Sequence, residues 1–199
     1  MPGVRLFTAV EPPESGAKVI LATRNLLRGI LGDGPIRWVR EPNFHLTLQF
    51  LGDTPESMVS LVQEILGAAT MAFATTGVRQ LRLATTIVGG FPNLNRPRVI
   101  WLGVADPHGD LAGLDALIRN GLREGDVPFD DKPLRPHVTL GYVRKPTNPG
   151  TRPSIRDAAA GASISEVAFI ADEVVLIQST LGQGGSVYSH RGRFPFQTR

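Results

Sequence analysis

Cysteine is absent from the 199 residues of this chain, which excludes a disulfide framework, a thiolate zinc site and a catalytic cysteine. We find no apolar run that approaches the roughly 20 residues needed by a membrane-spanning helix. The N-terminus enters a strand-like pattern at once, without the apolar region of a signal peptide. These absences predict a cytoplasmic protein with no membrane partner.

Lysine is also scarce, because Lys18, Lys132 and Lys145 are the only lysines and the other basic residues are arginine. The 21 basic residues exceed the 18 acidic ones and give a net charge of +3. This excess permits a nucleic-acid or phosphate partner without requiring one, and arginine suits bidentate contacts with phosphate.

The remaining composition is that of a globular protein, with 42% apolar and 20% charged residues. We expect residues 1–199 to form one bilobal domain of class α+β with antiparallel sheets, because strand-like and helix-like segments are mixed and most turns are short. The expected strands span 5–10, 36–39, 44–51, 81–88, 99–104, 136–143, 166–170, 173–179 and 186–196. Helices are expected after caps at Ser15 and Asp110 and from Pro55, with one short helix within 145–162.

The chain contains an internal repeat. The tetrapeptide His-Leu-Thr-Leu at 45–48 recurs as His-Val-Thr-Leu at 137–140, an offset of 92 residues. The same offset aligns the apolar strand at Phe7 with the one at Val99. We therefore expect two lobes related by a pseudo-twofold axis, each an antiparallel sheet with helices packed outside, and an active-site cleft between them.

Side chains alternate between the two faces of a strand. The faces expected to line the cleft carry His45, Thr47 and Gln49 from the first motif and His137, Thr139 and Gly141 from the second. Phe50 and Tyr142 would then lie on the opposite faces. A lone strand histidine is usually structural, but two His-x-Thr pairs in matching strands of a repeat favour a catalytic reading.

Two histidines and two threonines suit one kind of chemistry. An imidazole has an unperturbed pKa near about 6.5, so one can accept a proton from water while the other, protonated, gives a proton to a leaving alkoxide. Threonine hydroxyls can donate hydrogen bonds to phosphoryl oxygens. The pattern predicts cleavage of a strained cyclic phosphodiester without a metal or another cofactor.

At these residues the chain resembles the two-histidine phosphoesterase superfamily, and within it the RNA 2′,3′-cyclic phosphodiesterase group, also called 2′-5′ RNA ligases. The resemblance rests on the segments 5–10, 38–40, 43–52, 91–93, 96–99 and 135–140 and on Tyr188 with Phe194-Pro195, and it covers essentially the whole chain. It implies that His45 is the proton donor, that His137 is the proton acceptor and that Thr47 and Thr139 bind phosphate. The implied product is a 2′-phosphate, and the reverse reaction would be 2′-5′ ligation.

The chain departs from the family at one position, because members often carry an arginine five residues after the second histidine, where Tyr142 stands here. Arg144 and Arg98 are the candidates to supply that charge. Further candidate substrate-binding residues, by position or likeness to the family, are Phe44, Arg135 and Tyr188.

Other residues that could suggest a functional site are expected to have structural roles. His108 lies in a turn before a helix, and His190 is expected on an exposed edge strand. Trp38 and Trp101 could stack on a base, but core packing is favoured. The glycine-rich run 181–186 lacks the Lys-Ser/Thr of a phosphate-binding loop and predicts a hairpin turn.

Three alternative functions remain open. A closely related enzyme would act on small cyclic nucleotides instead of RNA ends, and a non-catalytic RNA- or nucleotide-binding module would have kept the fold without turnover. A metal-binding protein that uses the four histidines is disfavoured, because neither motif has a further ligand at suitable spacing. The leading reading is a monomer that acts on RNA or oligonucleotides with 2′,3′-cyclic phosphate ends.

Overall fold

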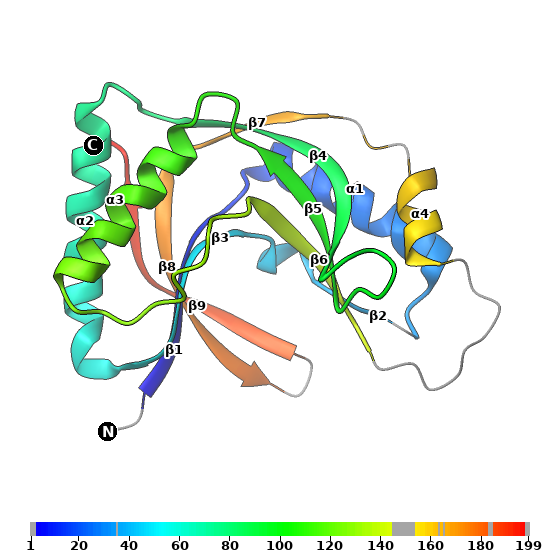
Figure 1. Cartoon of the computed structure of the whole chain (residues 1–199), viewed down its shortest axis with the longest axis horizontal. Helices are drawn as coiled ribbons and strands as arrows, with labels where there is room; N and C mark the ends of the chain where they lie inside the picture. Colours follow the sequence, from blue (N-terminus) through cyan, green and yellow to red (C-terminus); the bar gives the residue numbers. More distant parts are fainter. Residues whose placement is uncertain are drawn as a thin grey trace.

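A curled antiparallel sheet runs through the middle of the molecule, and helices cover both of its ends (Figure 1). The computed structural model describes residues 3–34, 36–144, 154–162, 164, 166–182 and 185–197. The strands are β1 (Gly3–Val10), β2 (Ile36–Trp38), β3 (Leu46–Pro55), β4 (Leu81–Phe91), β5 (Val99–Ala105), β6 (His137–Val143), β7 (Ala168–Ala171), β8 (Glu173–Gly182) and β9 (Gly185–Pro195). The helices are α1 (Glu14–Leu31), α2 (Val59–Thr75), α3 (Asp110–Glu124) and α4 (Ile155–Gly161), with 3₁₀ turns at Glu41–Asn43 and Glu56–Met58. The predicted α+β class with antiparallel strands is confirmed.

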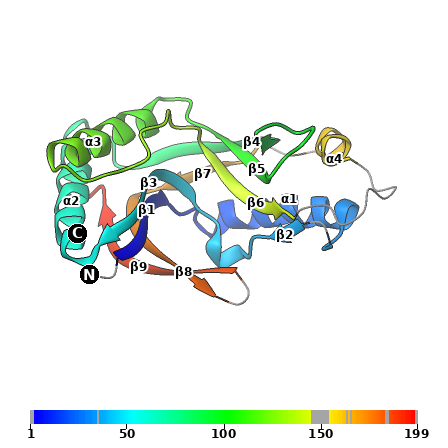
Figure 2. The same cartoon turned by 60° about the horizontal axis from the view of Figure 1, so that its bottom comes forward.

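The two halves of the sheet meet at the two His-x-Thr motifs. The strand order is β7-β4-β5-β6-β3-β1-β8-β9, and β2 pairs with β6. Within the described residues, β3 and β6 pair through Leu46 and Val138 alone, which are the middle residues of the two motifs. In the turned view of Figure 2, the β8–β9 hairpin lies below this junction and β4 and β5 lie above it. The pseudo-twofold axis therefore passes between the motifs.

The predicted repeat holds residue by residue in the sheet. Val10 pairs with Leu46 in the first half, and their counterparts Leu102 and Val138 pair in the second. The Phe7–Phe50 pair corresponds in the same way to the Val99–Tyr142 pair. The halves are interwoven, since α1, which follows β1, packs on β2, β6 and β7.

A matching β-bulge interrupts both motif strands. The ladder of β1 with β3 skips Leu48, and the ladder of β5 with β6 skips Leu140, the residue 92 positions later. A one-residue slip moves all following side chains to the other face. The prediction from strict alternation is therefore wrong beyond each bulge.

The two bulges determine where four residues lie. Gln49 is 1% exposed and donates a 2.5 Å hydrogen bond to the carboxylate of Asp115 on α3, and Gly141 is buried. Phe50 lines the cleft with Thr47, and Tyr142 is 36% exposed. Each bulge thus places an aromatic ring on the face that carries the histidine and threonine.

Several predicted boundaries also need correction. Ser15 lies inside α1, whose N-cap is Pro13, and Asp110 is the first residue of α3 after Gly109. The carboxylate of Asp106 accepts a hydrogen bond from the backbone N–H of Ala112 in the first turn of α3. The glycine pair 89–90, which lies beyond the end of the expected strand 81–88, continues β4 because it pairs with residues 100–101 of β5.

One apolar helical segment is longer than predicted, because the sequence was expected to contain no apolar run of roughly 20 residues. The helical segment Glu56–Thr75 is long and apolar enough to cross a membrane by length and composition alone. Its most apolar 18-residue window has a mean hydropathy of 1.4, and 33% of that window is buried. Its core-facing residues Val62, Leu66 and Phe73 are buried, and α2 packs against α3, β8 and β9. The absence of a membrane partner stays a prediction.

Candidate active site

Each motif histidine is held by a carbonyl two residues before it. The Nδ1 of His45 lies 2.9 Å from the carbonyl oxygen of Asn43, and the Nδ1 of His137 lies 2.5 Å from that of Arg135. A carbonyl only accepts hydrogen bonds, so Nδ1 is the donor in both rings. This assignment leaves Nε2 of each imidazole for proton transfer to or from a ligand.

Aromatic rings surround both histidines. The His45 ring centroid lies 4.8 Å from that of Phe7 and 5.3 Å from that of Tyr188, which meets it edge-on. The His137 centroid lies 5.0 Å from that of Phe91 and 6.0 Å from that of Trp101. Contacts of this kind fix the orientation of both imidazoles and shield them from water.

Burial lowers the pKa of both imidazoles. For His45, the loss of solvation is the largest cause; the Asn43 carbonyl and the Glu11 carboxylate oppose it, and the charge of His137 adds to it. For His137, burial also dominates, and only the Arg135 carbonyl opposes it. Both imidazoles therefore stay neutral down to a lower pH than an ordinary histidine does. A bound anion would favour the protonated form of each ring.

Glu11 distinguishes the two histidines. It follows Val10, the partner of Leu46 in the β1–β3 ladder, so it lies beside His45. Its counterpart by the repeat is Gly103, which pairs with His137 and has no charge. Glu11 could not be predicted from the sequence, because its position beside His45 depends on strand register.

The Glu11 carboxylate also belongs to a small network with β9. One oxygen lies 2.8 Å from Nε2 of His190, and the other lies 3.3 Å from the guanidinium of Arg193. Arg193 also pairs with Glu173. His190 is half-exposed on β9, as predicted, and acts here as a neighbour of Glu11.

A cavity of about 600 Å³ lies at the junction of the two halves. It is lined by Thr47, Leu48, Phe50, Phe91, Asp130, Lys132, Pro133, Leu134, Arg135 and His137. Thr139 is half-buried in β6 opposite Trp101. Within the described parts of the chain neither motif threonine uses its hydroxyl in a hydrogen bond, so both hydroxyls are available to a ligand.

The remaining candidate residues fall into three groups. Arg135 lines the cavity beside His137, and Tyr188 touches His45, so both lie at the site. Phe44, also a candidate substrate-binding residue, is 3% exposed and packs in the main core, so its side chain does not line the cavity. Arg98 and Arg144 are exposed, and among the described contacts neither guanidinium reaches a motif residue.

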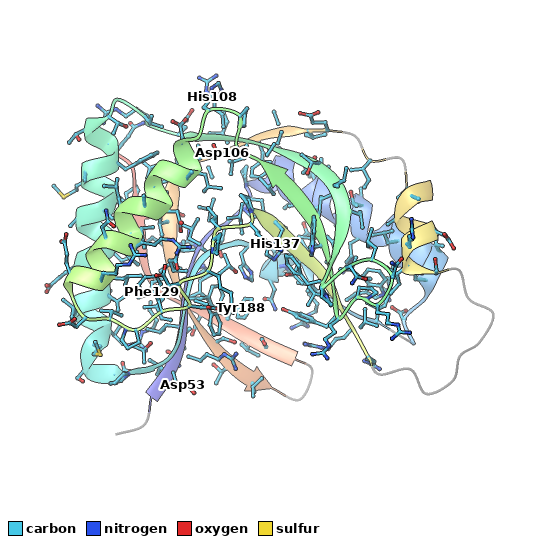
Figure 3. All side chains as sticks on the ribbon, in the orientation of Figure 1. Asp53, Asp106, His108, Phe129, His137 and Tyr188 are labelled. Carbon is cyan, nitrogen blue, oxygen red and sulfur yellow. The ribbon has the colours of Figure 1, made fainter. Side chains whose placement is uncertain are left out.

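His108 is far from this constellation. Figure 3 shows it on the loop between β5 and α3 at the edge of the molecule, whereas His137 and Tyr188 lie near the middle. The described residues contain no group of three or more His, Asp or Glu side chains that could hold a metal ion.

Gly89 controls the packing behind His137. A Cβ at this position would lie 2.1 Å from the Trp101 ring, which in turn contacts His137. We expect Gly89→Ala to destabilise the protein by about 1–3 kcal/mol, the usual cost of overpacking. Urea unfolding measures this loss. Gly67→Ala on α2, where nothing lies within 4 Å, is the control, and an equal or smaller loss in Gly89→Ala would contradict the account.

Comparison with known proteins agrees with this geometry. A family profile described as "LigT like Phosphoesterase" matches residues 10–101 and again 102–188, two segments that begin 92 residues apart. An RNA 2′,3′-cyclic phosphodiesterase of Aquifex aeolicus is 33% identical in an alignment that covers 77% of this chain and 78% of that protein. One of Archaeoglobus fulgidus is 30% identical over 71% of this chain and 74% of that protein.

Solved structures show the same fold. The protein TT0787 of Thermus thermophilus has a TM-score of 0.73 at 25% identity and covers 96% of this chain and 97% of its own. Escherichia coli LigT, crystallised with 3′-AMP, has a TM-score of 0.69 at 23% identity, covering 97% and 98%. The predicted membership of the two-histidine phosphodiesterases is confirmed: the chain belongs to the LigT-like phosphoesterase family.

Proposed function

We propose that the protein hydrolyses RNA 2′,3′-cyclic phosphodiester ends to 2′-phosphomonoesters by acid–base catalysis with two histidines. The observation that carries the proposal is the pair of Nδ1-anchored imidazoles, each two residues before a threonine, on strands that meet at the pseudo-twofold axis. The activity of relatives named RNA 2′,3′-cyclic phosphodiesterase supports the choice of substrate.

The proposed step transfers two protons. Nε2 of His137 takes a proton from water, the water oxygen bonds to phosphorus, and the bond between phosphorus and O3′ breaks. His45 gives its Nε2 proton to O3′, which leaves the phosphate on O2′. Because the two imidazoles supply both transfers, we propose that the reaction needs no metal.

The two threonines bind the phosphate in this scheme. The Thr47 and Thr139 hydroxyls donate to the non-bridging oxygens, whose negative charge grows in the transition state. The reverse reaction, with a 5′-hydroxyl in place of water, would form a 2′-5′ linkage.

Glu11 supports the choice of His45 as the acid. A carboxylate beside an imidazole favours the protonated ring, and Glu11 lies beside His45 whereas Gly103 stands beside His137. His190 and Arg193 hold this carboxylate on the β9 side and weaken its effect. The remaining attraction separates the two otherwise similar histidines.

Removal of the Glu11 charge should therefore change the pH dependence of the rate. The protonated acid is lost at high pH, so the alkaline limb of kcat/KM reports the pKa of His45, which burial places below the ordinary histidine value. Glu11→Gln should move this limb further toward low pH and reduce kcat/KM above neutral pH by roughly three- to tenfold. A pH profile of kcat/KM measures the shift.

Glu173→Gln is the matched control for this prediction. It removes the other carboxylate on Arg193 while it leaves Glu11 beside His45. The alkaline limb of this variant should stay within the error of the wild type. If Glu11→Gln moves only the acidic limb, His45 is the base and the assignment is reversed.

Identification of the product tests the proposed function. An oligoribonucleotide with a 2′,3′-cyclic phosphate is incubated with the protein, and the end group is compared with authentic 2′- and 3′-phosphates by chromatography. We expect the 2′-phosphate. A 3′-phosphate contradicts the scheme, and binding without turnover favours the non-catalytic module. Turnover of mononucleotide cyclic phosphates alone favours the small-substrate enzyme.

A further inference from the structure

A second cavity, of about 130 Å³, opens beside Tyr188 on the His45 side of the site. Two arginines, Arg37 and Arg40, contribute to its lining together with Tyr142 and Tyr188. Among the described residues that line it, none is acidic. The cavity beside His137 is lined by one acidic residue, Asp130, together with Lys132, which pairs with it, and Arg135. The small cavity is therefore the more cationic end of the cleft.

Arg37 is held over the ring of Tyr142. The two residues are paired in the β2–β6 ladder, and the guanidinium carbon lies 4.6 Å from the ring centroid. Tyr142 lies on the cleft side of β6 because of the bulge at Leu140. Gly185 leaves room beneath the guanidinium, since a Cβ there would lie 2.6 Å from it. The stack therefore places the charge of Arg37 beside Tyr142, the position at which members of the family often carry an arginine.

The Arg37 guanidinium is free to bind an anion. Five other arginines pair with carboxylates, namely Arg28, Arg119, Arg123, Arg191 and Arg193. Within the described part of the chain, Arg37 has no such partner. Two neighbouring donors are occupied, because Trp38 donates to the Gly32 carbonyl and Asn43 donates to the Ser186 carbonyl.

Tyr188 links this cavity to the reaction centre. Its ring meets His45 edge-on at 5.3 Å. Arg37, Tyr142 and Tyr188 line the same cavity, so these groups lie close to one another. An anion on Arg37 would thus be a neighbour of the nucleotide whose phosphate lies between the histidines.

We infer that Arg37, stacked on Tyr142, binds the phosphate that precedes the cyclic end of the RNA. This inference rests on the proposed function and specifies its substrate: the enzyme prefers an oligoribonucleotide to a mononucleoside cyclic phosphate. Arginine recognises phosphate by bidentate, charge-assisted hydrogen bonds. Arg37, and neither Arg98 nor Arg144, supplies the cation near position 142.

The test compares two substrates that differ by the preceding adenosine and the phosphodiester that joins it to the cyclic end. One is adenosine 2′,3′-cyclic phosphate with a free 5′-hydroxyl, and the other is the dinucleotide ApA with a 2′,3′-cyclic phosphate. Arg37→Ala should lower kcat/KM about tenfold for the dinucleotide and less than about twofold for the mononucleoside. Higher salt should reduce the preference of the wild type for the dinucleotide.

Arg82→Ala, an exposed arginine on β4, is the matched control and should leave both rates unchanged. Equal losses of Arg37→Ala on the two substrates, or no loss on the dinucleotide, would overturn the inference. If the wild type turns over neither substrate, the proposed function fails and the inference is tested by binding of ApA with a 2′-phosphate. Weaker binding by Arg37→Ala then supports it, and equal binding overturns it.

Discussion

Replacement of His45 or His137 with alanine is expected to lower kcat/KM for an RNA 2′,3′-cyclic phosphate by about 10²–10⁴-fold. General acid–base catalysis by a positioned side chain contributes a factor of this order. The loss should be large at both positions, because each imidazole is anchored through Nδ1 and, in the proposed scheme, uses Nε2 in the same step. Initial rates over a range of substrate concentrations measure the effect.

The control for the histidine variants is His108→Ala. His108 lies on the loop before α3, away from His137 (Figure 3), so its loss should leave the rate unchanged. Because His45 packs against Phe7 and Tyr188, thermal unfolding of each variant must show that the fold persists. A folded His45→Ala or His137→Ala that keeps more than a tenth of the wild-type rate would contradict the roles proposed for these residues.

The second large effect is expected at the threonines. Thr47→Val and Thr139→Val keep the shape of the side chain but remove the hydroxyl, and each should lower kcat/KM by about 10²-fold. Loss of one preorganised donor to a developing oxyanion has a cost of this order. Steady-state kinetics on the dinucleotide cyclic phosphate measures both variants.

Serine at each position is the matched control. Thr47→Ser and Thr139→Ser retain the hydroxyl, so they should keep the rate within a few-fold of the wild type. Valine variants as active as the serine variants would show that the hydroxyls do not bind the phosphate. An effect at Thr47 alone would limit the phosphate site to the first motif.

The central arrangement could be predicted from the sequence because the motif itself is repeated. An offset of 92 residues between His45 and His137 is sufficient to propose a pseudo-twofold axis. The pairing of Leu46 with Val138 places that axis between the motifs, and each half repeats the same ladder. Local patterns of apolar residues likewise located most strands, since alternation and burial act within a few residues.

The positions beyond each bulge could not be predicted. Leu48 and Leu140 resemble any other apolar residue of an alternating strand, and nothing in the sequence marks them as unpaired. The extra residue at each site sends Gln49 into the core, where Asp115 accepts its hydrogen bond and Arg119 pairs with that carboxylate. It also brings Tyr142 to the cleft.

Residues that act through strand register were missed for a related reason. Glu11 lies beside His45, and Arg37 lies over Tyr142, only because distant segments pair in a particular register. The sequence pointed to Arg144, which has the same strand parity as Tyr142, and to Arg98, which comes directly before the second buried strand. Monomeric state and cytoplasmic location stay predictions.

The most direct test of the central claim is a double-mutant cycle on the two histidines. If His45 and His137 act in the same step, removal of the second costs little once the first is gone. We expect the double alanine variant to be about as slow as the slower single variant on an RNA 2′,3′-cyclic phosphate. A double variant whose loss equals the product of the two single losses would contradict paired catalysis.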